Sequence, residues 1–458
     1  MARLPLRVAR ISSNGNLVRA VYSDMLIRLS LGVLVVLLAA APLSAVDYDL
    51  PPISYSSTPV DDPVARLAGR LARGEARLAW DTDHGWLPSL LSELRIPVSS
   101  QVLVFSKTSL QRQHIAPDAP RALYFNDEVY VGTVQGGAVL EIAATDPRQG
   151  TVFYVLPQKR GASSTLTRQT HECLQCHDSN SFTGGVPGLV MRSVYPDASG
   201  QPIFTAGGFV TDHRTRWEDR WGGWYVTGTY GTMRHLGNQS FAEGIDPTQV
   251  DRTPGANLTA LTGRFAEDAY LGHGSDVVAL MVLGHQVQMH NLLTRASYDT
   301  RLALRDAEVM NQALGRPLGE RSESVQRRIS SAAEALLHHL LFVGEPRLSG
   351  PVAGNPAYAR DFTAVGPRDG PGRSLRDLDL GRRLLRHPCS WLIHSEAFDA
   401  LPAEVRELTL ERLRQVLTGE DQTPEFSHLD AADRRAIGEL LVATKPLLPL
   451  GFRAAFTR

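Results

Sequence analysis

The chain has 458 residues, 43% of them hydrophobic, which is enough apolar side chain to build buried cores in two or three domains. Its formal net charge is −1, and because nothing in this balance suggests binding to nucleic acid, no nucleic-acid partner is expected. Its three cysteines are too few for the disulfide framework of a small secreted protein.

The first 45 residues have the organisation of a secretory signal peptide. An apolar run at 29–41 follows Arg28, and Pro42-Leu43-Ser44-Ala45 leads into a polar segment. We expect cleavage after Ala45, with residues 1–24 as an extended n-region or as an over-long start before Met25. The run is short for a membrane span, although an uncleaved anchor is the alternative. The mature chain is therefore predicted to be periplasmic or secreted and not membrane-spanning.

Residues 46–165 are predicted to form an α+β domain. Helical spacing of leucines covers 62–95 and is followed by short β-rich runs at 102–105, 122–125, 129–134, 139–143 and 151–156. The turn formers Asn126-Asp127 and Gly136-Gly137 separate consecutive runs. An antiparallel β meander with flanking helices is the simplest arrangement of these elements.

The strongest chemical signal in the chain is Cys173-Leu174-Gln175-Cys176-His177. This C-x-x-C-H spacing is typical of c-type haem attachment, in which two thiols form thioethers with the porphyrin vinyl groups and the adjacent imidazole ligates the iron. We therefore expect one covalent haem per chain, with Cys173 and Cys176 binding the cofactor and His177 binding the metal. A zinc site that also uses His171 is the alternative, but predicted export favours haem.

The attachment segment, 166–265, is predicted to be irregular and rich in glycine and aromatic residues. In the compact all-helical cytochrome c fold the motif lies on a helix, whereas here Gly184, Gly185 and Gly188 interrupt any helix soon after His177. Residues 205–240 concentrate tryptophan, tyrosine and arginine. They could supply walls for a haem and cations for its propionates, or form a small aromatic core.

The region 266–458 is predicted to be helical. A helix capped by Ser275-Asp276 runs to Leu314, and others cover 322–342, 402–417 and the residues after Asp430. A Gly/Pro-rich connection occupies 346–372. Within the second helix His338 and His339 are expected to be partly exposed, and Cys389 is expected to be a small buried residue. Candidates for a sixth haem ligand are His285, His290, Met289 and His213.

Residues 121–127 and 220–228, together with the five-residue motif, resemble a family of secreted cytochrome-c-domain proteins of environmental bacteria. The resemblance covers most of the mature chain. It implies attachment roles for Cys173, Cys176 and His177, and it implies no particular reaction.

The motif predicts a periplasmic c-type cytochrome that takes part in electron transfer with redox partner proteins. A haem-dependent oxidoreductase, with an open or weakly ligated distal site for a small oxidant or substrate, is the alternative, so the sequence leaves open whether the protein is an enzyme. A redox or gas sensor is a third possibility, but no signalling domain is visible. The motif identifies a cofactor and leaves its use open.

Overall fold

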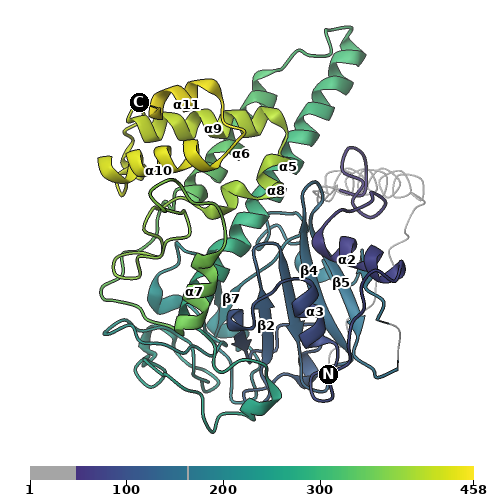
Figure 1. The fold of residues 1–458 in the computed structure, drawn as a ribbon, viewed down its shortest axis with the longest axis vertical. Coiled ribbons are helices and arrows are strands. Elements are labelled where there is room, and N and C mark those ends of the chain that lie inside the picture. Colours follow the sequence, from purple (N-terminus) through teal and green to yellow (C-terminus); the bar gives the residue numbers. More distant parts are fainter. Residues whose placement is uncertain (1–47, 162–163, 458) are drawn as a thin grey trace, which may run out of the picture. The chain divides into compact units, whose positions relative to one another are not determined.

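Six antiparallel strands in sequential order form the central sheet (Figure 1). The computed structural model describes residues 48–161 and 164–457, so the predicted signal peptide at 1–45 lies outside the described residues. The strands are β1 (Val102–Val104), β2 (Arg121–Phe125), β3 (Val129–Thr133), β4 (Val139–Asp146), β5 (Gly150–Pro157) and β6 (Thr167–Gln169). The predicted meander is confirmed. Strand β6, which is short and polar, was not predicted from the sequence.

The pleat of the sheet separates two hydrophobic cores. Tyr124, Ile142 and Tyr154 point to one face, where α2 (Pro63–Ala72) and α3 (Leu87–Glu93) cover them. The residues next to them in sequence, such as Phe125 and Phe153, point to the opposite face and join the larger core. Both faces are buried because side chains alternate along each strand and each face has its own helical cover.

The larger core is built around α5 (Val277–Leu314), which packs on β5 and on α6 (Glu323–Leu340). Asp276 caps the first turn of α5 by accepting a hydrogen bond from Ala279 N, and Gly315 ends the helix in the left-handed conformation, with φ of 64°. Both ends of this helix agree with the prediction. Nearly all its residues between Val277 and Leu293 are buried, as expected for a central helix.

The remaining α-helices of the described residues lie mostly in the C-terminal region, and together with the antiparallel sheet they make the fold α+β and not all-helical. They are α4 (Leu174–His177), α7 (Pro356–Ala364), α8 (Glu396–Asp399), α9 (Ala403–Thr418), α10 (Ala431–Thr444) and α11 (Leu450–Phe456). The predicted Gly/Pro-rich connection at 346–372 contains α7, which Asn355 caps and Pro356 begins. A two-stranded sheet of β7 (Arg192–Val194) and β8 (Gly208–Val210) follows the attachment motif.

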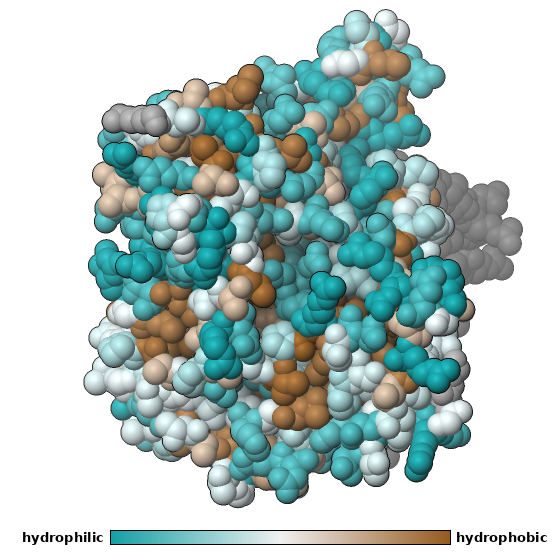
Figure 2. All heavy atoms as spheres, viewed as in Figure 1, coloured by the Kyte–Doolittle hydropathy of each residue, from teal (hydrophilic) through white to brown (hydrophobic). Residues whose placement is uncertain are grey.

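On the face shown in Figure 2, hydrophobic side chains form separate patches between hydrophilic ones. Among the described residues, no helix combines the length and the apolar character that a membrane crossing requires. Tyr48–Arg458 cluster as one compact unit.

Candidate functional site

The attachment motif forms a single helical turn at the protein surface. Cys173 occupies the N-cap position of α4, and its carbonyl oxygen accepts a hydrogen bond of 3.0 Å from the backbone N–H of His177. Cys173 is half-buried and Cys176 is exposed, and neither forms a disulfide. Burial raises the pKa of the Cys173 thiol to about 11, so Cys176 is the more readily ionised of the two by its exposure. The helical turn brings residues three and four positions apart to the same side.

The His177 ring is held in one orientation by two contacts. Its Nδ1 lies 2.9 Å from the carbonyl oxygen of Gly188 and donates to it, and the ring packs against Phe153 of β5 with centroids 4.8 Å apart. Burial lowers the pKa of His177 below its usual value, which keeps the imidazole neutral. Because the carbonyl fixes the proton on Nδ1, the lone pair of Nε2 is available to a metal.

The loop that supplies this carbonyl is fixed on α5. Asn291 accepts a hydrogen bond from Leu189 N at 2.9 Å and donates one to Leu189 O at 2.7 Å. A side chain at position 188 would collide with the Asn291 amide, so glycine permits the close approach. Gly184 and Gly185 both have φ of 76°, a left-handed conformation that turns the chain after the motif. The predicted interruption of the helix after His177 is confirmed.

An ion pair of the sheet that was not predicted from the sequence lies close to the motif. Arg121 of β2 and Glu141 of β4 are 2.5 Å apart, and both charges act on the pKa of His177. Gly132 lies between the two residues on the intervening strand β3, and its lack of a side chain leaves room for the guanidinium group of Arg121. The Nε of Arg121 is buried without a hydrogen-bond partner. Arg121 begins a strand, and no sequence pattern distinguished it from an ordinary edge arginine.

The chemistry of these residues fits a c-type haem. Two thiols outside any disulfide, one half-buried and one exposed, lie on one turn, and the following imidazole is neutral, oriented and free at Nε2. Zinc at the motif receives no support, because a zinc site needs close-set ligands. Within residues 48–161 and 164–457, the one group of potential ligands close enough to share an ion lies elsewhere, at His213, His285 and His339.

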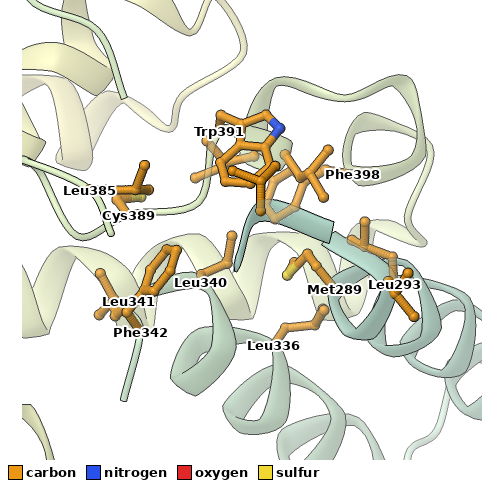
Figure 3. Close-up of a cluster of buried hydrophobic side chains, with 14 of the residues drawn as sticks. Met289, Leu293, Leu336, Leu340, Leu341, Phe342, Leu385, Cys389, Trp391 and Phe398 are labelled. Carbon is orange, nitrogen blue, oxygen red and sulfur yellow. The ribbon is translucent and has the colours of Figure 1, made fainter. Parts of the chain in front are cut away.

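Two of the candidates for a sixth ligand are engaged in the core. His290 is buried, and its Nδ1 lies 2.9 Å from the Tyr130 hydroxyl and 3.1 Å from the Thr145 hydroxyl. Met289 is fully buried in the hydrophobic cluster around Leu336 and Phe398, as Figure 3 shows. These contacts hold neither residue in a position to act as the sixth ligand of an iron bound by His177.

The other two candidates for a sixth ligand, His213 and His285, contact each other. His213, in the loop after β8, and His285, on α5, approach within 3.0 Å through their Nδ1 atoms, and His339 of α6 packs against both rings. We refer to these three residues as the histidine cluster. The expectation that His339 is partly exposed was wrong, because it is 2% exposed. His339 follows Leu336 by three positions and therefore lies on the apolar face of the helix. This spacing could have predicted that His339 is buried.

The aromatic segment at 205–240 packs against itself. Trp217 and Trp221 meet edge to face with centroids 4.9 Å apart, and the buried Arg220 guanidinium lies over both rings. Its side chain also donates hydrogen bonds to the backbone carbonyls of His213 and Thr215. Of the two predictions for this segment, these contacts favour the aromatic core.

Cys389 is fully buried beside Leu385 (Figure 3), and burial raises the pKa of its thiol to about 12. The expectation of a small buried residue is confirmed. Such a thiol is a poor nucleophile at neutral pH.

A cavity of about 640 Å³ lies at another place in the fold, between the sheet and the C-terminal region. Its wall includes Phe125, Tyr358 and Trp391 together with the ion pair between Asp127 and Arg376. The attachment motif does not line it. The cavity was not predicted, because its residues come from separate parts of the chain.

No family model matches the chain, and comparisons with curated proteins and with solved structures return no match.

Proposed function

We propose that the protein is an exported c-type cytochrome that carries one covalent haem on Cys173 and Cys176, with His177 as the proximal ligand, and that it takes part in electron transfer. The observation that carries this proposal is the local geometry of the motif. Its thiols form no disulfide, Cys176 is exposed, and His177 is anchored at Nδ1 by Gly188 so that Nε2 is free.

The haem would supply one-electron redox chemistry, with a potential that depends on the axial ligands and on nearby charges. The residues of this chain have separate roles around it. Gly188 fixes the tautomer of His177, and Asn291 fixes the position of Gly188. Arg121 contributes a half-buried positive charge near His177. The exposure of Cys176 leaves the attachment site accessible to a partner redox protein.

The alternative function is a haem-dependent oxidoreductase, and one observation favours it. His213, His285, His290 and Met289 all have other contacts, so none of them is poised as a sixth ligand. A position without a protein ligand can bind a small oxidant or substrate.

Absorption spectra and rapid mixing with carbon monoxide and peroxide separate the two functions. An electron-transfer protein is expected to give low-spin spectra in both oxidation states, to bind carbon monoxide slowly and to reduce a soluble c-type cytochrome quickly. High-spin spectra with rapid carbon monoxide binding and peroxide turnover would reject electron transfer as the main role and support the oxidoreductase.

A further inference from the structure

The histidine cluster joins three separate parts of the chain inside the larger core. His213, His285 and His339 are each no more than 2% exposed. Their ring centroids are 4.3 to 5.0 Å apart. One nitrogen of each residue lies within 4.8 Å of one nitrogen of both others. Phe342 and Trp391 pack around the rings, so water has little access to this place.

The hydrogen bonds give the three rings a common arrangement. The Nε2 atoms face outward, to Val343 O for His213 at 3.4 Å, to the Ser390 hydroxyl for His285 at 2.8 Å, and to the backbone carbonyl of His285 for His339 at 3.0 Å. Carbonyl oxygens only accept, so the Nε2 atoms of His213 and His339 carry protons, and their Nδ1 atoms present lone pairs.

One atom of the cluster lacks a donor. His339 Nδ1 is buried and has no hydrogen-bond partner, whereas the Nδ1 atoms of His213 and His285 share one proton in the 3.0 Å hydrogen bond between them. A buried acceptor without a donor is costly, and each one calls for a structural explanation. A cation bound between the three Nδ1 atoms would satisfy His339 Nδ1 as well, and the Nε2 bonds to Val343 O and to the Ser390 hydroxyl would fix His213 and His285 as metal-bound histidines usually are.

We propose that His213, His285 and His339 bind one first-row transition-metal ion of the zinc or copper class through their Nδ1 atoms. Neutral imidazole nitrogen is a preferred ligand for both metals. Burial lowers the pKa of all three histidines, so no proton competes for the lone pairs at neutral pH. The nearest negative charge acting on His339 is the buried carboxylate of Asp212.

His213 and His285 need to move little to bind an ion, whereas His339 must reorient its ring. Ligand nitrogens around tetrahedral zinc are about 3.4 Å apart, and the Nδ1 atoms of His213 and His285 are already 3.0 Å apart. The His339 ring lies nearly parallel to that of His285, at 6°, and must turn about its terminal torsion to point Nδ1 at the ion. The bound metal would cross-link α5, α6 and the loop after β8.

The test uses the exported protein as it is isolated, with or without haem. Its zinc and copper content is measured by mass spectrometry of the elements, and its melting temperature is followed by circular dichroism before and after chelation. We expect about one equivalent of zinc or copper per chain, a lower melting temperature after chelation, and recovery on addition of zinc or copper sulfate alone. The element that is bound distinguishes the two metals. Iron is counted separately and belongs to the haem.

Two variants make the assignment specific. His339→Phe keeps an aromatic ring in the stack and should lower bound zinc or copper at least tenfold, whereas His290→Gln changes a buried histidine of α5 outside the cluster and should leave it unchanged. Wild-type protein that neither contains zinc or copper nor gains stability from them would overturn the proposal, and so would His339→Phe protein that binds as much metal as wild type. These results do not depend on haem attachment at Cys173 and Cys176.

Discussion

At the scale of single residues, Asn291 is the link between the central helix and the attachment motif. Its amide makes both hydrogen bonds to Leu189, next to the carbonyl that orients His177. Asn291→Leu leaves two half-buried backbone groups unpaired, so we expect the free energy of unfolding to fall by about 2–3 kcal/mol. The imidazole should lose its fixed orientation, and the reduction potential of the attached haem should change.

Asn311→Leu is the matched control for this prediction. Asn311 also lies on α5, is buried and donates to backbone carbonyls, at Leu318 and Glu320. Urea denaturation should therefore show a comparable loss of stability, while redox titration should show an unchanged potential. If Asn291→Leu and wild-type protein had the same reduction potential, Asn291 would have no role in orienting His177.

Arg121 is expected to tune the potential through its charge. Arg121→Gln removes a cation near His177 and leaves the Glu141 carboxylate without its ion-pair partner. Both changes make the surroundings of the haem more negative and favour the oxidised state, so the midpoint potential should fall by roughly tens of millivolts. Redox titration measures it, with the exposed Arg327→Gln as control. An unchanged or raised potential would contradict the role of Arg121.

His235 makes stability depend on pH. Gly237 N donates to its Nδ1 at 2.9 Å, its Nε2 lies 2.6 Å from the Tyr230 hydroxyl, and burial lowers its pKa to about 3. The unfolded chain takes up this proton near pH 6.5 and the folded chain does not. Stability is therefore complete above pH 6.5 and is lost as the pH falls towards 3, by about 1.4 kcal/mol per pH unit for this group.

Urea midpoints between pH 7 and pH 5 check this sign. His235→Gln should show a shallower loss of stability than wild type over this range, and replacement of the exposed His114 by glutamine should leave the loss unchanged. Wild-type protein that becomes more stable as the pH falls from 7 to 5 would refute the prediction.

At the scale of elements, the first turn of α5 depends on Asp276. This buried carboxylate accepts hydrogen bonds from Ala279 N and from Asn355 N, and thereby also holds the segment that precedes α7. Asp276→Ala should lower the free energy of unfolding by about 2 kcal/mol, whereas Asp430→Ala, at the exposed cap of α10, should cost about 1 kcal/mol. Urea denaturation compares the two variants, and equal costs would show that burial of the Asp276 cap adds nothing.

Elements with a strong local pattern could be predicted from the sequence. The meander follows alternating β-branched runs and their turns, and α5 begins and ends at its capping residues Asp276 and Gly315. Elements that depend on tertiary contacts could not be predicted in this way. Strand β6 is polar and pairs at an edge, and α7 is a short helix within a segment whose glycines and prolines indicated a loop.

At the scale of the whole molecule, a candidate site made of consecutive residues could be recognised in the sequence, whereas a candidate site assembled by the fold could not. The motif from Cys173 to His177 carries its own spacing. The histidine cluster requires α6 to pack on α5 and the loop after β8 to reach both helices. The hydrogen bonds of Asn291 require the loop that follows the motif to pack against α5. Such contacts between distant residues leave no periodic signal in one sequence.

Covalent haem attachment is the central claim, and a denaturing gel of exported protein stained for haem peroxidase activity tests it most directly. Wild-type protein should keep its stain after denaturation, with one haem per chain by pyridine haemochrome absorbance. The double substitution Cys173→Ala with Cys176→Ala should remove the stain, and Cys389→Ala should keep it. A wild-type band without stain, or an equally stained double variant, would contradict the account.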